Sequence, residues 1–271
     1  MSKLNDLINE LCPDGVEYIK IKDICEISRG KVISKDYIKD NPGDFPVYSS
    51  QTENNGELGK ISTYMFDGNY ITWTTDGANA GTVFYRTGKF NITNVCGLLN
   101  VKSENIIIKF VYYILQTKTL NYVNKGMGNP KLMSNIMAEI SIFAPPLEVQ
   151  KEIVRILDNF TDYIDCLEKE LELRKKQYSY YRDKLLTFGN DVEYKTLNEI
   201  TTLSRGVRVV KNQLEKTGNI PVYQNSMTPL GYYTKSNCKA NTTFIIGAGS
   251  AGEIGFSSVE FWSADDCYYF I

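Results

Sequence analysis

The chain has 271 residues and contains no histidine. Histidine is the commonest general base and a common metal ligand, and it activates many serine and cysteine nucleophiles. Its absence excludes Ser-His and Cys-His catalytic pairs. An enzyme built on this chain would have to rely on carboxylates or lysines, so the sequence favours a non-catalytic role.

Long apolar runs and paired cysteines are also missing. No segment approaches the ~20 apolar residues that a membrane span needs, and the start "MSKLNDLINELCPDG" does not resemble a signal peptide. The cysteines are scattered and form no C-x-x-C pair, which favours reduced, structural thiols: Cys12, Cys25, Cys96, Cys166, Cys238 and Cys267. We predict a cytoplasmic protein with no metal site and no membrane contact.

A positive net charge is lacking as well, because the formal charge is -2 and the pI is about 5.5. A generic nucleic-acid binder is basic, so DNA binding would depend on local patches. Residues 118–131 hold three lysines and no acid, and residues 205–216, ending at Lys216, hold four cations against one glutamate. Acidic residues gather between positions 148 and 172. The sequence thus predicts basic loops and an acidic helical half.

An internal repeat organises the chain. "EISRGKVIS" (residues 26–34) matches "TLSRGVRVV" (202–210), and "FPVYSSQT" (45–52) matches "IPVYQNSM" (220–227). "ANAGTVFY" (78–85) matches "GSAGEIGF" (249–256), and Phe90 and Cys96 match Phe261 and Cys267. The blocks keep their order with slowly drifting offsets, which indicates a duplicated domain.

The second copy is shorter than the first. Copy 1 covers about residues 18–145, whereas copy 2 covers about 194–271 and ends at a residue that aligns with Asn100. The final "CYYFI" has the pattern of the middle of a buried strand. We expect a truncated gene product, a fragment, or one piece of a split protein.

A long helix is predicted between the copies. Pro145 and Pro146 suit a helix start, and residues 147–188 would form a helix of roughly 60 Å. Its heptad seam has one polar member, Arg174, and nine apolar or aromatic members: Ile153, Leu157, Phe160, Ile164, Leu167, Leu171, Tyr178, Tyr181 and Leu185. This pattern predicts a coiled coil that needs a partner helix, and the chain shows no other helix of that length. The alternative is a core helix of one large domain.

The predicted fold class is α+β: a mixed α/β domain, the long helix, then a second partial domain. Segments 70–77 and 81–88 are rich in β-branched and aromatic residues, so we predict strands. Residues 105–117 are apolar on nearly every face, which predicts a buried helix. "GAGSAG" (247–252) fits G-x-G-x-x-G, but a strand-like segment follows it, so a glycine-rich turn is favoured over a dinucleotide site.

Turn-rich loops carry amides and cations at corresponding places in both copies. Lysine and arginine can neutralise phosphates, while arginine, asparagine and glutamine can read base edges in pairs of hydrogen bonds. These loops include "SSQTENNG" (49–56), "KGMGNPK" (125–131) and "QNSMTPLG" (224–231). One such loop alone is typical of any solvated surface. Their recurrence in two copies favours DNA binding.

The sequence resembles the specificity subunits of type I restriction-modification systems. The resemblance rests on "LCPDGVEYIKIKDICEISRGK", "FPVYSSQTENNG", "KGMGNPKLMSNIMAEISIFAPPLEVQKEIVRILD" and "VEYKTLNEITTLSRG", and it covers the whole chain. It implies a first target-recognition domain at 1–145, a spacer helix at 146–189 and an incomplete second recognition domain at 190–271. Each recognition domain would read half of a bipartite site, and the helix would set the gap.

The resemblance also implies partners and cofactors. The chain would be a non-catalytic subunit that binds double-stranded DNA and docks methyltransferase (M) subunits, which carry S-adenosylmethionine and methylate adenine. Restriction (R) subunits, which use ATP and magnesium, would join the complex. No cofactor would be bound by this chain. Because copy 2 is incomplete, the chain would be either a half-subunit active as a homodimer through the helix seam, or an inactive or recombining cassette.

Recognition domains differ in sequence between targets, so the DNA-contacting residues are predicted from loop position and residue type. The predicted residues are Ser28, Arg29, Lys31, Gln51, Asn54, Asn55, Asn79, Lys125, Asn129 and Lys131 in copy 1, and Arg205, Arg208, Gln224, Asn225 and Ser250 in copy 2. Two other classes remain as alternatives. One is a nuclease with acids near Asp76 and Asp265, and the other is a coiled-coil protein whose domains bind protein.

Overall fold

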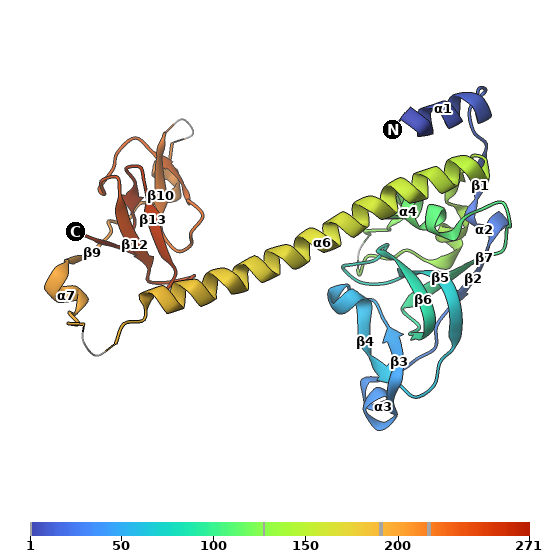
Figure 1. Cartoon of the computed structure of the whole chain (residues 1–271), viewed down its shortest axis with the longest axis horizontal. Helices are drawn as coiled ribbons and strands as arrows, with labels where there is room; N and C mark the ends of the chain where they lie inside the picture. The colour runs from blue at the N-terminus through green and yellow to red at the C-terminus, as the bar shows by residue number, and fades with distance from the viewer. Residues whose placement is uncertain (1, 127, 190–191, 216–217) are drawn as a thin grey trace. The chain divides into compact units, whose positions relative to one another are not determined.

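The computed structural model describes residues 2–126, 128–189, 192–215 and 218–271 (Figure 1). The chain forms two compact units, Met1–Gln177 (unit 1) and Tyr178–Ile271 (unit 2). Both are rich in sheet, and a long helix lies between the two sheet-bearing segments in the sequence, so the predicted α+β fold is confirmed. The domain boundaries at 145/146 and 189/190 stay a prediction, and residues 190 and 191 lie outside the described part.

Unit 1 contains a six-stranded sheet with the order β2-β7-β5-β6-β3-β4, and a separate pair β1-β8. All its strand pairs are antiparallel except β3 with β6. Its elements are α1 (Ser2–Leu11), β1 (Tyr18–Lys20), α2 (Ile21–Ile24), β2 (Cys25–Arg29), α3 (Lys35–Asp40), β3 (Pro42–Tyr48), η1 (Glu53–Gly56), β4 (Glu57–Ile61), β5 (Phe66–Thr74), β6 (Val83–Ile92), β7 (Cys96–Val101), α4 (Ile108–Lys118), η2 (Thr119–Tyr122), α5 (Ser134–Glu139) and β8 (Ser141–Phe143).

The core of unit 1 lies on the sheet face that α4 covers. Alternation along β5 directs Ile71 and Trp73 into this core, while Thr72 on the other face accepts a hydrogen bond from Arg86. Strands β5 and β6 confirm the two predicted strand segments. Helix α4 confirms the predicted helix at 105–117, although it begins at Ile108, and it buries one face through Phe110, Val111, Ile114 and Leu115.

Unit 2 contains two smaller sheets, with the orders β13-β12-β15-β9 and β11-β10-β14. Its elements are α7 (Leu197–Ile200), β9 (Leu203–Arg205), η3 (Lys211–Gln213), β10 (Ile220–Tyr223), β11 (Gly231–Tyr233), β12 (Thr242–Ile246), β13 (Ile254–Ser257), β14 (Trp262–Ser263) and β15 (Cys267–Phe270). The strand predicted for "CYYFI" is confirmed as β15, which lies between β12 and β9, but the prediction that it is buried holds only for Cys267, and Ile271 is exposed. "GAGSAG" forms the turn from β12 to β13, with positive φ at Gly249 and Gly252, so the predicted turn is confirmed.

The duplication is confirmed residue by residue in the strand registers. Arg29 of β2 pairs with Gly97, and its counterpart Arg205 of β9 pairs with Tyr268, 171 residues after Gly97. Both copies also contain one parallel pair at matching positions, β3 with β6 and β10 with β14. A Cβ on Gly30 would lie 2.1 Å from a backbone carbonyl oxygen, and the same is true of Gly206. The repeat therefore preserves the close contact between this glycine and a neighbouring backbone segment, as well as the sequence.

One sheet face differs sharply between the units. In unit 1, α4 and α5 cover it, and Ile24 and Val83 are each 6% exposed. The aligned residues of unit 2, Ile200 and Ile254, are 63% and 65% exposed. Among the residues described after β15 or elsewhere in unit 2, no helix equivalent to α4 is present. Unit 2 therefore presents an apolar face that unit 1 buries.

Helix α6 (Leu147–Leu186) begins after Pro146 as predicted and ends two residues before the predicted Phe188. Its start is fixed by Gln150, whose buried amide donates to the carbonyls of Asn105 and Pro145 and accepts from the Ile107 amide. Further along, Asp158 accepts hydrogen bonds from groups of α4, which lies against the first turns of α6 (Figure 1). Unit 1 therefore holds the first turns of α6 firmly.

The predicted seam of α6 changes character along its length. Ile153 packs against the core of unit 1, and Leu157 is partly buried. The remaining predicted members are exposed apolar or aromatic side chains: Phe160, Ile164, Leu167, Leu171, Tyr178, Tyr181 and Leu185. A stripe of this kind is stabilised only when another surface covers it.

Candidate nucleic-acid interface

Four polar side chains of unit 1 meet where β2 and β5 end, two of them predicted (Arg29 and Lys131) and two adjacent (Thr75 and Asp76). The Arg29 Nη2 donates to Thr75 Oγ1 at 2.7 Å, and the Thr75 hydroxyl donates to Asp76 Oδ2 at 2.6 Å. Arg29 Nη2 also lies 3.4 Å from Asp76 Oδ2, and Lys131 Nζ lies 3.6 Å from Asp76 Oδ1. The structure thus brings Arg29 and Lys131, 102 positions apart in the sequence, to one carboxylate.

The loop that carries Lys131 is tied to the end of β5 by its backbone. Asp76 and Lys131 form an antiparallel bridge, and the Gly77 amide donates to the Pro130 carbonyl at 3.0 Å. Asn124 and Lys131 close this loop through two backbone hydrogen bonds. Asn124, Asn129 and Lys131 line a pocket of about 340 Å³. Predicted residues Asn129 and Lys131 therefore project from a held loop, and Lys125 is exposed on it.

The loop after β3 has an unusual backbone. Asn54 and Asn55 are exposed and have φ of 48° and 53°, in the left-handed region that asparagine tolerates better than most residues. Gln51 donates through its side-chain amide to the Glu57 carbonyl, which closes the loop. Beneath it the guanidinium of the buried Arg86 lies 3.5 Å from the centre of the Tyr48 ring. The loop therefore exposes the side-chain amides of Asn54 and Asn55 on a turn with left-handed backbone conformation.

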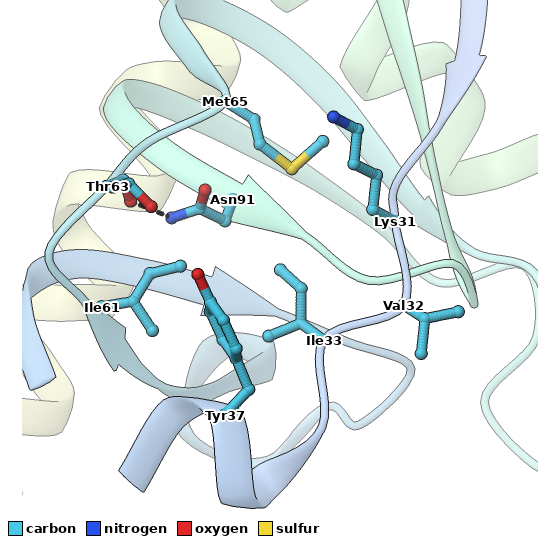
Figure 2. Close-up of a pocket in the computed structure, with 8 residues that line it drawn as sticks. All are labelled: Lys31, Val32, Ile33, Tyr37, Ile61, Thr63, Met65 and Asn91. Atoms are coloured by element: carbon cyan, nitrogen blue, oxygen red, sulfur yellow. Dashed lines mark hydrogen bonds between the residues drawn. The ribbon is translucent and has the colours of Figure 1, made fainter. Parts of the chain in front are cut away.

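A second pocket adjoins this region. Lys31 bridges to Thr93, whose hydroxyl lies 3.0 Å from the hydroxyl oxygen of Ser49. Figure 2 shows Lys31 on the wall of a pocket of about 250 Å³, together with Val32, Ile33, Tyr37, Ile61, Thr63, Met65 and Asn91. The buried Asn91 amide donates to the Thr63 carbonyl at 2.8 Å, so its polar group is used within the protein. Among the described residues that line this pocket, most are apolar and Lys31 is the cation.

Unit 2 gathers a comparable set around Arg205. The Arg205 Nε donates to the Asp265 carbonyl at 2.7 Å, and the Gln224 amide donates to Asp265 Oδ1 at 3.4 Å. The Ser250 amide donates to the Asn225 carbonyl at 2.9 Å. The end of β9, which carries Arg205, and the loops that carry Gln224, Asn225 and Ser250 are therefore linked by hydrogen bonds, in part through Asp265.

The remaining predicted residues are less closely joined. Asn79 is exposed, and its carbonyl accepts from the Thr74 hydroxyl. Arg208 is exposed on the loop after β9, and Ser28 is half-buried on β2. Lys216, which contributes to the predicted basic loop, lies outside the described residues. As DNA contacts, all the residues selected from the sequence stay predictions.

Sequence reasoning missed Thr75 and Asp76 as members of this site. Asp76 entered it only as an acid of a possible nuclease. The available signal was position, because both residues lie near the end of the predicted strand segment 70–77 and directly follow β5 in the structure. Over the described ranges, no group of three or more histidine, cysteine or acidic residues could hold a metal ion. In the same ranges, no helix is both long and apolar enough to cross a bilayer.

Comparisons with known proteins identify the family. The model of the type I restriction modification DNA specificity domain matches residues 13–174 and 189–271. A Mycoplasma pneumoniae protein assigned by name to the type I specificity subunits is 38% identical over 264 residues, which cover 93% of this chain and 72% of that protein. The specificity subunit of the type I restriction enzyme MpnII from the same organism is 46% identical over 186 residues, covering 67% of this chain and 56% of that protein.

The fold is similar to a solved structure as well. The crystal structure of the type I restriction-modification S subunit from M. genitalium has a TM-score of 0.66 and 18% identity, and covers 94% of this chain and 72% of that chain. The matched family model spans most of both units, so the chain belongs to the type I restriction-modification DNA specificity family. It is a DNA-recognition component of such systems and not a catalytic one, as the resemblance implies.

Proposed function

We propose that each sheet-bearing unit reads one half of a bipartite double-stranded DNA site. The supporting observation concerns the arginine of the Ser-Arg-Gly sequence in each unit, Arg29 or Arg205. Both arginines have the same strand register and lie next to loops that carry side-chain amides. Arginine and lysine of these loops would contact phosphates, and the amides would contact base edges. The chain would dock methyltransferase subunits, and no step of catalysis would be its own.

The partners and cofactors follow the same proposal. The methyltransferase subunits would carry S-adenosylmethionine and modify adenine, and restriction subunits would supply ATP- and magnesium-dependent activity in the cytoplasm. This chain would bind none of these cofactors.

We further propose that α6 forms a coiled coil with the α6 of a second copy, in antiparallel orientation. The exposed seam needs cover. Charge gives the direction: residues 147–172 carry eight acids and three bases, whereas 173–186 carry five bases and one acid. Antiparallel pairing places each acidic half beside a basic half. In this alternative arrangement, the complete first units of two copies would read the two half-sites, in place of unit 1 and unit 2 of one chain.

Methylome mapping tests the function. The chain is co-expressed with its cognate methyltransferase subunit in a methylation-free host, and modified adenines are located by single-molecule sequencing. A bipartite motif symmetric about its gap supports the homodimer, and an asymmetric bipartite motif means that unit 2 reads DNA. No modification by soluble, folded complex would refute the proposed function and favour an inactive cassette.

Helix pairing is tested separately by sedimentation of the purified chain. Leu171→Glu places a charge in the proposed seam, whereas Leu173→Glu makes the same change at an exposed leucine of α6 off the seam. We expect Leu171→Glu to convert dimer to monomer and Leu173→Glu to leave the dimer intact. Equal behaviour of the two variants contradicts pairing through this seam.

A further inference from the structure

The Asp76 carboxylate is an odd group to find on a surface that binds DNA. Its side chain is 26% exposed, and it lies between Arg29 and Lys131, both predicted DNA contacts. A carboxylate repels the phosphate backbone and holds cations that would otherwise neutralise phosphates. A group with this effect lowers affinity for DNA of any sequence. We therefore expect the Asp76 carboxylate to improve discrimination between the target sequence and other DNA.

The geometry places one oxygen of the Asp76 carboxylate where it can accept a hydrogen bond from a base. Oδ2 accepts from the Thr75 hydroxyl at 2.6 Å and lies 3.4 Å from Arg29 Nη2, which fixes the carboxylate plane. Among the described residues, the ion-pair partner of Oδ1 is the Lys131 ammonium at 3.6 Å, which is longer than a hydrogen bond. An oxygen held in this way can accept from an exocyclic amino group on a base edge.

The duplication indicates that this acid is not a requirement of the fold. By strand register, the residue of unit 2 that aligns with Asp76 is Ala248. In unit 2 Arg205 donates to the main-chain carbonyl of Asp265, whereas the Asp265 carboxylate accepts from Gln224. The carboxylate that contacts the arginine in unit 1 therefore has no counterpart at the aligned position of unit 2. An acid needed for the fold would occur in both copies, whereas an acid that reads a target can differ between copies with different targets.

We propose that Asp76 is a specificity-determining residue of unit 1, which accepts a hydrogen bond from the amino group of a cytosine or an adenine. It also restrains Arg29 and Lys131, so that these cations contact phosphate only when the base contact is made. This inference rests on the proposed DNA-reading function. It adds a base-contacting carboxylate to a site whose other predicted DNA contacts are mainly cations and side-chain amides.

The test measures how tightly the complex of this chain with its methyltransferase subunit binds two DNA duplexes. One duplex contains the motif found by methylome mapping, and the other has a random sequence. Asp76→Asn removes the charge at nearly constant shape. Asp44→Asn is the matched control, because Asp44 is exposed on β3 and the substitution changes the net charge equally. We expect Asp76→Asn to bind random DNA about threefold or more tightly and to lose about tenfold in discrimination at one base pair of the half-site. Asp44→Asn should preserve discrimination.

Asp76→Glu separates charge from geometry. It keeps the negative charge but moves the oxygens by one methylene, so random-DNA binding should stay at the wild-type level while discrimination falls. Tryptophan fluorescence reports whether each variant is folded, since Trp73, one of the two tryptophans, is buried in unit 1 and its ring nitrogen donates to the Leu132 carbonyl at 2.9 Å.

The outcomes distinguish the inference from the function beneath it. Discrimination that is unchanged in folded Asp76→Asn or Asp76→Glu overturns the role of Asp76 and leaves the proposed function standing. The same holds if affinities for target and random DNA change by one common factor. A wild-type complex that prefers no sequence refutes the proposed function, and with it the assignment of Asp76.

Discussion

Truncation of one isoleucine in each copy should have very different effects, because only one of the two is buried. Ile24 ends α2 in unit 1 and Ile200 ends α7 in unit 2, at equivalent positions of the repeat. Ile24 is 6% exposed in the core of unit 1, where α2 packs against α5, and Ile200 is 63% exposed. The substitution Ile→Ala is thus chemically identical at both sites, and the surroundings alone differ.

The expected magnitudes follow from burial. A buried isoleucine truncated to alanine costs about 2–5 kcal/mol, since transfer and cavity terms add. An exposed side chain away from special features changes stability by about 0.5 kcal/mol or less. We therefore expect Ile24→Ala to destabilise unit 1 by about 3 kcal/mol and Ile200→Ala to leave unit 2 nearly unchanged.

Hydrogen exchange with mass spectrometry measures both units in one experiment. Peptides of β5 and β7 report the opening free energy of unit 1, and peptides of β12 and β15 report that of unit 2. Each variant serves as the control for the other unit. A loss of 2 kcal/mol or more in unit 2 with Ile200→Ala would refute the reasoning, because it would mean that another surface covers Ile200 in solution.

Three further results are expected. Gly30→Ala should destabilise unit 1 by about 2–3 kcal/mol in urea unfolding, because the added Cβ would lie 2.1 and 2.4 Å from backbone carbonyl oxygens; wild-type stability would contradict this close approach. Hydrogen bonds from Lys20 and Lys22 lower the pKa of Glu139 to about 2, so its contribution to stability is complete above the ordinary glutamate pKa and is lost as pH falls toward 2. Glu139→Gln should therefore flatten the acid limb of the stability profile, and an unchanged limb would count against this pairing. Burial raises the pKa of Asp158, but hydrogen bonds from α4 outweigh it and the net pKa is lowered; Asp158→Ala should cost unit 1 about 1 kcal/mol in urea unfolding, and no loss would mean that these bonds contribute nothing.

Local patterns predicted the elements well where one physical signal dominated. The heptad after Pro146 predicted α6 to within two residues of its end, because apolar periodicity and a proline start act locally. Richness in β-branched and aromatic residues predicted strands at 70–77 and 81–88, and the structure places β5 at Phe66–Thr74 and β6 at Val83–Ile92. The repeat predicted two like domains, and the matching registers around Arg29 and Arg205 confirm it.

The candidate site was predicted only in part. Arg29 and Lys131 were selected from residue type and loop position, but their meeting at Asp76 depends on a hydrogen-bonded bridge between segments far apart in the chain. A sequence pattern reports periodicity within a segment and carries little information on pairing between distant segments. Thr75 and Asp76 were missed for that reason.

The sequence by itself determined that the chain contains a duplicated α+β domain and a long helix with an apolar seam, because composition and periodicity dictate local structure. It also determined the absence of histidine-based chemistry. The tertiary structure alone decided which cations share a carboxylate, and that one sheet face is buried in unit 1 and open in unit 2. Those features arise from contacts over long sequence separations, where chain folding and not local propensity sets the neighbours.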